Sequence, residues 1–125
     1  MILVDTSVWI DHFRKSDTGL KQLLRREQVV THPFVIGEIA LGHLKNRIVI
    51  LDSLYNLPAA TLASDLEVIK LIDIHGLAGT GIGYMDAHLL ASLKLMPGAL
   101  LWTRDKKLRT VVASFALELK ETATP

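Results

Sequence analysis

Short apolar runs alternate with helical patterns along this chain of 125 residues, and that alternation restricts the fold more than any other feature. Residues 2–5 (ILVD) and residues 99–103 (ALLWT) are largely apolar, which indicates strands that are buried on both faces. Such strands are typical of parallel sheets covered by helices. The sequence therefore predicts an α/β fold: a three-layer α/β/α sandwich with a central parallel sheet.

Helices are predicted where apolar residues recur every three or four positions and where capping residues or a proline can start them. They cover residues 6–13, 17–27, a stretch that begins at Pro33, and residues 47–55, 64–75, 84–95 and 105–112. Further short strands are predicted at residues 28–31 and 60–62 and, at an edge of the sheet, at residues 115–119.

The length and composition predict one domain. Half of the residues are hydrophobic, and a chain of this length buries roughly two-thirds of its unfolded surface. We expect one domain over residues 1–119 and a dispensable tail over residues 120–125. The chain has no cysteine, no basic leader and no uninterrupted apolar stretch near 18 residues. These features predict a cytoplasmic protein with no membrane segment.

Glu38 is the first candidate functional residue because it interrupts an apolar stripe. In a helix that begins at Pro33, Glu38 shares a face with Phe34, Val35 and Leu41. An unpaired polar group in apolar surroundings costs about 2 to 7 kcal/mol, so a partner should compensate the carboxylate. Besides a bound cation, two explanations are open: an ion pair with a buried arginine, or a helix edge at which the carboxylate reaches solvent.

Three further acids are expected near Glu38. Asp5 ends the first strand and Asp105 comes two residues after Thr103, so both fall at the edge of the sheet where ligands bind in such folds. Asp86 lies in the first turn of its helix, on the apolar face, and is predicted to point inward. Taken singly, these aspartates also fit helix caps or favourable charges at a helix N-terminus. Capping does not explain two acids on apolar stripes, which favours one shared site.

Four carboxylates in one pocket need a positive partner, because like charges at short range favour protonation. Oxygen donors without thiols or a tight histidine cluster favour Mg²⁺ or Mn²⁺. One or two such ions can activate water for in-line attack on a phosphodiester. The sequence therefore predicts a hydrolytic metal site whose ligands and catalytic residues are Asp5, Glu38, Asp86 and Asp105.

The order of four motifs resembles the PIN-domain ribonucleases. The motifs are VDTSVWID, PFVIGEIALG, MDAHLLAS and WTRDKKL, spread over residues 2–112. Within that family, the small VapC-type toxins of prokaryotic toxin–antitoxin pairs are the nearest match. The resemblance implies a parallel-sheet α/β/α fold, Mg²⁺- or Mn²⁺-dependent endoribonuclease activity on RNA, a cognate antitoxin and a homodimer.

The metal-binding acids of that family fall on the same four residues of this chain. Thr103 matches a position at which the family often has a hydroxyl that supports the site, and we add Thr6, next to Asp5, as a second supporting residue. His88 stands where the family usually has an aliphatic residue. Because it lies on the helix face opposite Asp86, we expect it to be exposed or to contact a partner.

Four basic residues flank the last acid and are predicted to hold RNA phosphates: Arg104, Lys106, Lys107 and Arg109. A solvated helix face explains them equally well. If the four acids share one site, the rest of the chain carries 14 basic against nine acidic residues, which suits a polyanion.

Other side chains have two interpretations each. Trp9, Phe13 and Trp102 could stack on unpaired bases, but core packing is the commoner role of such residues. Asp11 is expected to be solvated and is a weak fifth candidate for the site. Apolar helical surface between Pro33 and Leu57 is predicted to receive an antitoxin helix or a second subunit.

Two other functions compete with this one, and the first of them fails on the spacing of its acids. An aspartyl-phosphate phosphatase that uses Asp5 would need a second acid two residues later, where this chain has Ser7. A catalytically inactive PIN-like module would bind RNA or a partner helix without cutting it, since a sequence does not show whether four acids are correctly placed. The sequence does not identify the RNA or the antitoxin.

Overall fold

The computed structural model describes residues 1–121 and has a parallel sheet at its centre. Strand β1 (Ile2–Val4) is the middle strand and pairs with β2 (Val29–Val30) on one side and β3 (Leu100–Trp102) on the other. Leu3 and Val4 are fully buried, as expected for a strand covered on both faces. The predicted parallel α/β fold is confirmed.

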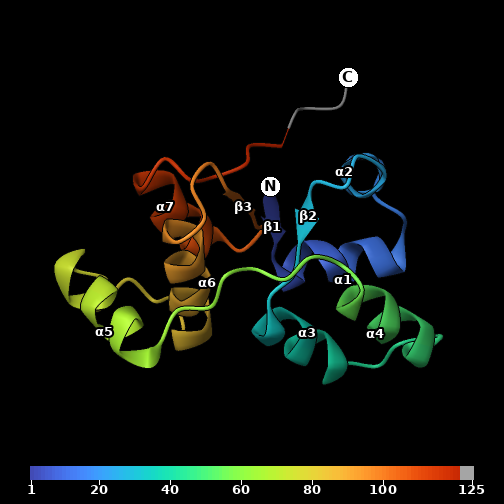
Figure 1. The fold of residues 1–125 in the computed structure, drawn as a ribbon, viewed down its shortest axis with the longest axis horizontal. Coiled ribbons are helices and arrows are strands. Elements are labelled where there is room, and N and C mark those ends of the chain that lie inside the picture. Colours follow the sequence, from blue (N-terminus) through green and yellow to red (C-terminus); the bar gives the residue numbers. More distant parts are fainter. Residues whose placement is uncertain (122–125) are drawn as a thin grey trace.

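Helices cover both sides of this sheet. Figure 1 shows α1, α3 and α4 on one side of β1, and α5, α6 and α7 on the other. The bounds of the helices are α1 Thr6–Arg14, α2 Thr18–Arg25, α3 Pro33–Ala40, α4 Arg47–Tyr55, α5 Asp65–Ile74, α6 Tyr84–Lys94 and α7 Lys106–Ser114. Each of these helices was predicted from the sequence, with bounds that differ by at most a few residues.

Capping side chains determine where several helices begin. Ser64 and Glu67 form a reciprocal capping box at the start of α5, and Asp17 accepts a hydrogen bond from the Leu20 amide at the start of α2. His32 caps α3, since its Nδ1 accepts from the Phe34 amide. Burial and the nearby His88 lower the pKa of His32 to about 4, so its ring is neutral at physiological pH.

Two predicted strands are wrong as strands. Next to the first segment, residues 60–62, an isolated bridge joins Thr31 and Ala59, and within the second, residues 115–119, another joins Leu101 and Glu118. Beyond the first bridge the chain leaves the sheet, and Leu62 is exposed. Each segment therefore pairs with the sheet at one residue only and does not form a strand.

The core is built from both helical layers and the sheet. Trp9 and Trp102 are buried, and the Trp9 ring stacks on Phe13 with their centroids 5.8 Å apart. These tryptophans are therefore core residues and do not present a face to RNA. No helix in residues 1–121 combines the length and the apolar character that crossing a membrane requires.

The predicted tail is attached to the domain at its second residue. Glu121 Oε1 accepts hydrogen bonds from Trp102 Nε1 and from Arg104 Nε, each at 2.6 Å. Glu121 thus contacts the domain, and the expectation that the tail is dispensable stays a prediction. The remainder of that segment, residues 122–125, lies outside the described residues.

Candidate active site

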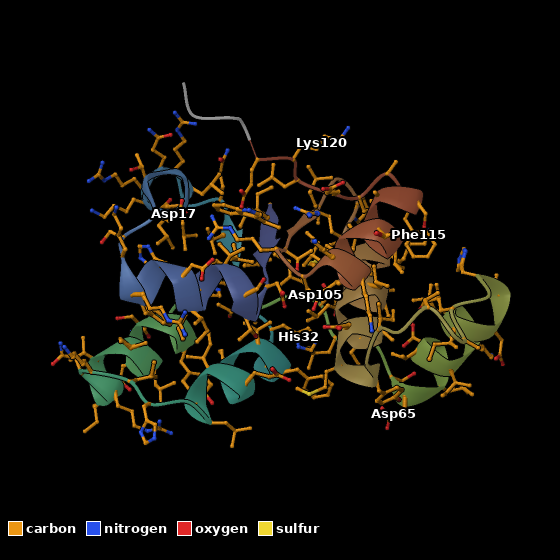
Figure 2. All side chains as sticks on the ribbon, turned by 180° about the vertical axis from the view of Figure 1, so that it is seen from behind. Asp17, His32, Asp65, Asp105, Phe115 and Lys120 are labelled. Atoms are coloured by element: carbon orange, nitrogen blue, oxygen red, sulfur yellow. The ribbon has the colours of Figure 1, made fainter. Side chains whose placement is uncertain are left out.

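One open pocket is lined by all four acids that the sequence selected: Asp5, Glu38, Asp86 and Asp105. It has a volume of about 470 Å³ and lies beyond the carboxyl ends of β1 and β3. Asp5 follows β1, Glu38 comes from α3, Asp86 from the first turn of α6, and Asp105 immediately precedes α7. Figure 2 shows Asp105 near the centre of the molecule, where α7 begins. Their roles in metal binding and catalysis stay predictions.

Asp5 is held in place by two hydroxyl groups. It is 8% exposed, and its Oδ2 accepts hydrogen bonds from Ser7 Oγ and Thr103 Oγ1, both at 2.8 Å. Although Asp5 occupies the N-cap position of α1, its side chain makes no capping bond. The helix-cap explanation therefore does not apply to Asp5, and its carboxylate is oriented toward the pocket by Ser7 and Thr103.

Of the residues around Asp5, sequence reasoning missed Ser7. Ser7 Oγ donates to Asp5 Oδ2 and accepts from the Arg104 amide at 3.0 Å. It therefore connects the segment that follows β1 to the segment that follows β3. Thr6 lines the pocket as well, but Asp5 takes its side-chain hydrogen bonds from Ser7 and Thr103 instead. A hydroxyl two residues after a strand-end acid was the available signal for Ser7.

The prediction that Glu38 points into the core is wrong. Val35, Ile36 and Ile39 form the buried face of α3. The face that carries Glu38 points outward, and Leu41, three residues further on, is 90% exposed. Glu38 thus reaches solvent at the helix edge, at the mouth of the pocket, and its role as a metal ligand stays a prediction.

The pKa of Asp86 is raised by its position in the shared pocket. It is half-buried, and burial together with the charges of Asp5, Asp105 and Glu38 raises its pKa to about 6. A hydrogen bond with the Gly83 backbone opposes this rise. The three other carboxylates are thus close enough to disfavour ionisation of Asp86, as expected for acids gathered without a cation.

Asp105 both caps α7 and lines the pocket. Its Oδ1 accepts a hydrogen bond from the Leu108 amide at 2.9 Å and caps α7, while its own amide donates to Thr103 Oγ1 at 3.1 Å. The helix-cap explanation is therefore correct for Asp105. Because the cap uses one oxygen, the other carboxylate oxygen is left for the pocket.

The pocket residues fit a hydrated divalent cation. Among the described residues, no three acidic or histidine side chains converge into a ready ligand group. Mg²⁺, however, keeps several waters and takes few protein carboxylates, so a tight cluster is not required. An all-oxygen donor set and the raised pKa of Asp86 both indicate negative charge that a cation would compensate.

The four basic residues near Asp105 fall into two groups. Arg104 donates to Asp11 Oδ2 at 2.8 Å, Asp17 Oδ2 at 2.7 Å and Glu121 Oε1 at 2.6 Å, and its guanidinium lies over the Trp102 ring. We call these charged residues the Arg104 cluster. Since three carboxylates occupy its guanidinium, the structure argues against RNA binding by Arg104. Asp11, the weak fifth candidate, belongs to this cluster and not to the pocket lining.

Lys106, Lys107 and Arg109 are exposed on α7. The Lys107 side chain lies against Gly81, which has a φ of +86°, and a Cβ atom at Gly81 would come within 2.8 Å of Lys107 Cδ. Glycine suits both the positive φ and that close approach. Lys107 is therefore packed against the glycine-rich loop that leads to Gly83 and the pocket.

The prediction that His88 is exposed or contacts a partner is wrong, because α5 packs against that face of α6. His88 is 5% exposed, and its Nε2 lies 3.0 Å from Asp65 Oδ1. Its ring is packed between Phe34 at 4.7 Å and Tyr84 at 4.8 Å, measured between centroids. His88 thus belongs to the packing that joins α3, α5 and α6 around the pocket.

The sequence is similar to known proteins over nearly its whole length. The family model described as the PIN domain matches residues 2–113, and the chain belongs to that family. Ribonuclease VapC32, found in two strains of Mycobacterium tuberculosis, is 47% identical over 121 residues, which cover 97% of this chain and 98% of the relative. The expected resemblance to VapC-type PIN domains is confirmed.

Proposed function

We propose that this protein is a metal-dependent endoribonuclease that acts as the toxin of a toxin–antitoxin pair. The observation that carries the proposal is the pocket lined by Asp5, Glu38, Asp86 and Asp105, in a chain similar over its length to Ribonuclease VapC32. RNA is the substrate class, and the cytoplasm is the expected place of action. The pocket is open to solvent, so its acids are accessible to a substrate.

Asp5, Glu38, Asp86 and Asp105 would hold one or two Mg²⁺ or Mn²⁺ ions. Bound there, a divalent ion supplies positive charge that stabilises the phosphate oxygens and acidifies a water for attack on phosphorus. Ser7 and Thr103 orient the Asp5 carboxylate through its Oδ2. A cation bound there would offset the neighbouring carboxylates and lower the pKa of Asp86 from the value of about 6 that it has in the cation-free pocket.

The remaining basic residues of α7 would hold the RNA phosphates. Lys107 is the best placed, since its stem lies against Gly81 at the side of the pocket. Lys106 and Arg109 are exposed on the same helix and add sequence-independent attraction. Arg104 supports the site through its backbone amide, which donates to Ser7 Oγ.

A cleavage assay tests the proposed activity. A structured RNA pool is incubated with Mn²⁺, Mg²⁺ or EDTA and the unaltered protein, Asp5→Asn or Glu38→Gln, each confirmed to be folded by circular dichroism. Asp73→Asn, on the exposed face of α5, is the matched control. We expect metal-dependent cutting that both pocket variants lose and the control keeps.

Each other outcome has a defined meaning. Cutting that survives EDTA or both pocket substitutions contradicts the four-acid mechanism. RNA binding without cutting in any metal supports the alternative, a catalytically inactive PIN-like module.

Two exposed apolar areas support the proposed protein partners. On α3, α4 and the turn between them, Leu41, Ile48, Val49 and Tyr55 are between 66% and 90% exposed. We assign this area to an amphipathic helix of the cognate antitoxin. A second area on α5, with Leu66, Ile69 and Ile74, gives a second copy of the chain a separate place in a homodimer.

Solution mass measurements test both assignments. Light scattering of the unaltered protein should give the mass of a dimer, and Leu66→Glu with Ile74→Glu should give a monomer. Ile48→Glu with Val49→Glu should weaken antitoxin binding but keep the dimer. Antitoxin binding that survives the α4 substitutions contradicts the first assignment, and a monomeric unaltered protein contradicts the second.

A further inference from the structure

Tyr84 is an aromatic side chain in the pocket wall that the metal chemistry does not use. It is the first residue of α6, lies two positions before Asp86, and lines the pocket together with Gly83 and Met85. The residue is 45% exposed. An aromatic ring exposed beside a phosphodiester-cleaving site is available to contact the substrate.

The Tyr84 ring is fixed in spite of its exposure. Its hydroxyl donates to Asp65 Oδ1 at 2.9 Å, and the same oxygen lies 3.0 Å from His88 Nε2. The rings of Tyr84 and His88 are perpendicular, at 88°, with centroids 4.8 Å apart. Figure 2 shows Asp65 on α5, next to the end of α6 from which Tyr84 comes. Asp65 therefore anchors Tyr84 to the neighbouring helix α5, and the Tyr84 side chain has little conformational freedom left to lose on binding.

This anchoring leaves ring surface free. A perpendicular neighbour can cover at most one of the two faces of an aromatic ring, and Gly83, the residue before Tyr84, has no side chain to obstruct the approach. Every nucleobase has a flat face that stacks on such a ring. A paired base inside a duplex is already stacked on both sides and does not reach it.

We propose that Tyr84 is a stacking platform for the unpaired base next to the phosphodiester that is cut, an inference that rests on the proposed ribonuclease function. It makes the substrate class an RNA segment with an unpaired base at that position, in a loop or a single strand. The Asp65 and His88 contacts are positioning contacts, since they hold the ring and do not touch the base.

Binding of a fluorescent RNA tests the proposal without cleavage. The probe is a ten-nucleotide unstructured RNA with 2-aminopurine at one position, moved along the strand, in buffer with Ca²⁺ or EDTA; anisotropy reports affinity and quenching reports stacking. The variants are Tyr84→Trp, Tyr84→Phe and Tyr84→Leu. Leu62→Ala is the control, because Leu62 is exposed, does not line the pocket and belongs to neither apolar area assigned above.

We expect the unaltered protein to quench 2-aminopurine strongly at one position. Tyr84→Leu should lose this quenching and bind about 5- to 100-fold more weakly, the range that stacking of one base supplies. Tyr84→Trp should keep both, and Tyr84→Phe should keep the quenching although it loses the hydroxyl bond to Asp65. An abasic site at the quenched position should weaken binding to the unaltered protein and add little to Tyr84→Leu, because both changes remove the same contact.

Three outcomes would overturn the inference. Equal affinity and quenching in Tyr84→Leu and the unaltered protein excludes a stacking role, even if metal-dependent cleavage is found. If Tyr84→Phe loses as much RNA affinity and quenching as Tyr84→Leu, and both variants have a lower melting temperature, then Tyr84 has a structural role and does not stack on a base. A change in dimer mass with unchanged RNA affinity assigns it to a protein interface. If position-specific quenching occurs but no RNA is cut, the nuclease proposal fails and the base platform stands.

Discussion

The acidic pocket and the Arg104 cluster each gather several carboxylates and differ in how that charge is compensated. In the cluster, one guanidinium bonds to Asp11, Asp17 and Glu121 at 2.6 to 2.8 Å. In the pocket, burial and the charges of three neighbouring carboxylates raise the pKa of Asp86 to about 6. The cluster carries its own cation, and the pocket needs one from solution.

This difference separates carboxylates that maintain the fold from carboxylates that are available to a ligand. Natural folds seldom leave several acids close together without a counter-charge, because repulsion and burial both cost free energy. The two regions are also connected: the Arg104 amide donates to Ser7 Oγ, and Ser7 donates to Asp5. A change in one region can therefore reach the other through a single hydroxyl group.

The largest effect is expected for Asp86→Asn. It should reduce RNA cleavage by about 100-fold or more, since it removes a proposed metal ligand, and even the contacts that support such a ligand are worth about 10- to 100-fold. The same change should raise the melting temperature of the cation-free protein, because it removes the carboxylate that its neighbours repel. Cleavage gels and thermal unfolding in EDTA measure the two effects. A lower melting temperature would break the comparison, as it would mean that the pocket is compensated within the protein.

Arg104→Ala is expected to act in the opposite way. It leaves three carboxylates without their cation and should lower the free energy of unfolding by about 1 to 3 kcal/mol, with or without Mg²⁺. Urea unfolding measures this loss, with Arg25→Ala on the exposed face of α2 as control. An Arg104→Ala protein as stable as the unaltered one would show that the cluster contributes nothing to stability.

Ser7→Ala tests the link between the two regions. Loss of one of the two hydroxyl bonds to Asp5 should weaken Mg²⁺ binding about 10-fold and change the melting temperature little. Cleavage should fall at low Mg²⁺ and recover at high Mg²⁺, and Ser53→Ala on α4 should match the unaltered protein throughout. A deficit that high Mg²⁺ does not restore would place the role of Ser7 elsewhere.

The pH dependence of stability gives the smallest effect. The pKa of Asp86 is higher in the folded, cation-free protein than its usual value of 3.8, so the folded state binds the extra proton between about pH 4 and pH 6. The contribution of Asp86 to the free energy of unfolding therefore falls as the pH rises through this window. The stability gain of Asp86→Asn over the unaltered protein should be small at pH 4 and reach its maximum above pH 6. A gain that does not change with pH, measured by urea unfolding in EDTA, would contradict the raised pKa.

Local patterns in the sequence were sufficient for the helices, the parallel sheet and the choice of the four acids. Strand ends and helix starts are encoded by neighbouring residues, and these are the positions that Asp5, Asp86 and Asp105 occupy. The exposure of Glu38 was not predictable in this way, because the apolar residues of α3 fit two faces of the helix. The tertiary fold buries Val35, Ile36 and Ile39 and leaves the face of Glu38 and Leu41 exposed.

The remaining errors concern contacts between distant segments. His88 was expected to be exposed because nothing near it in the sequence shows that α5 covers α6. Arg104 was expected to bind RNA because it stands in a run of basic residues beside Asp105. Two of the carboxylates that it contacts instead, Asp11 and Asp17, are 93 and 87 residues away in the sequence. The anchored Glu121 follows from the same cluster. Pairing of this kind depends on the tertiary fold and leaves no periodic signal along the chain.

The place of Asp5 at the end of the middle strand has a consequence for how the site can be switched off. β1 is paired on both sides and buried, so its amides should exchange with solvent only when the whole domain unfolds. Glu38, in contrast, lies on the exposed side of α3 at the mouth of the pocket. A partner bound beside α3 would therefore cover one acid and leave Asp5 in place. Inhibition by that route would be reversible, and the released enzyme would regain its site without refolding.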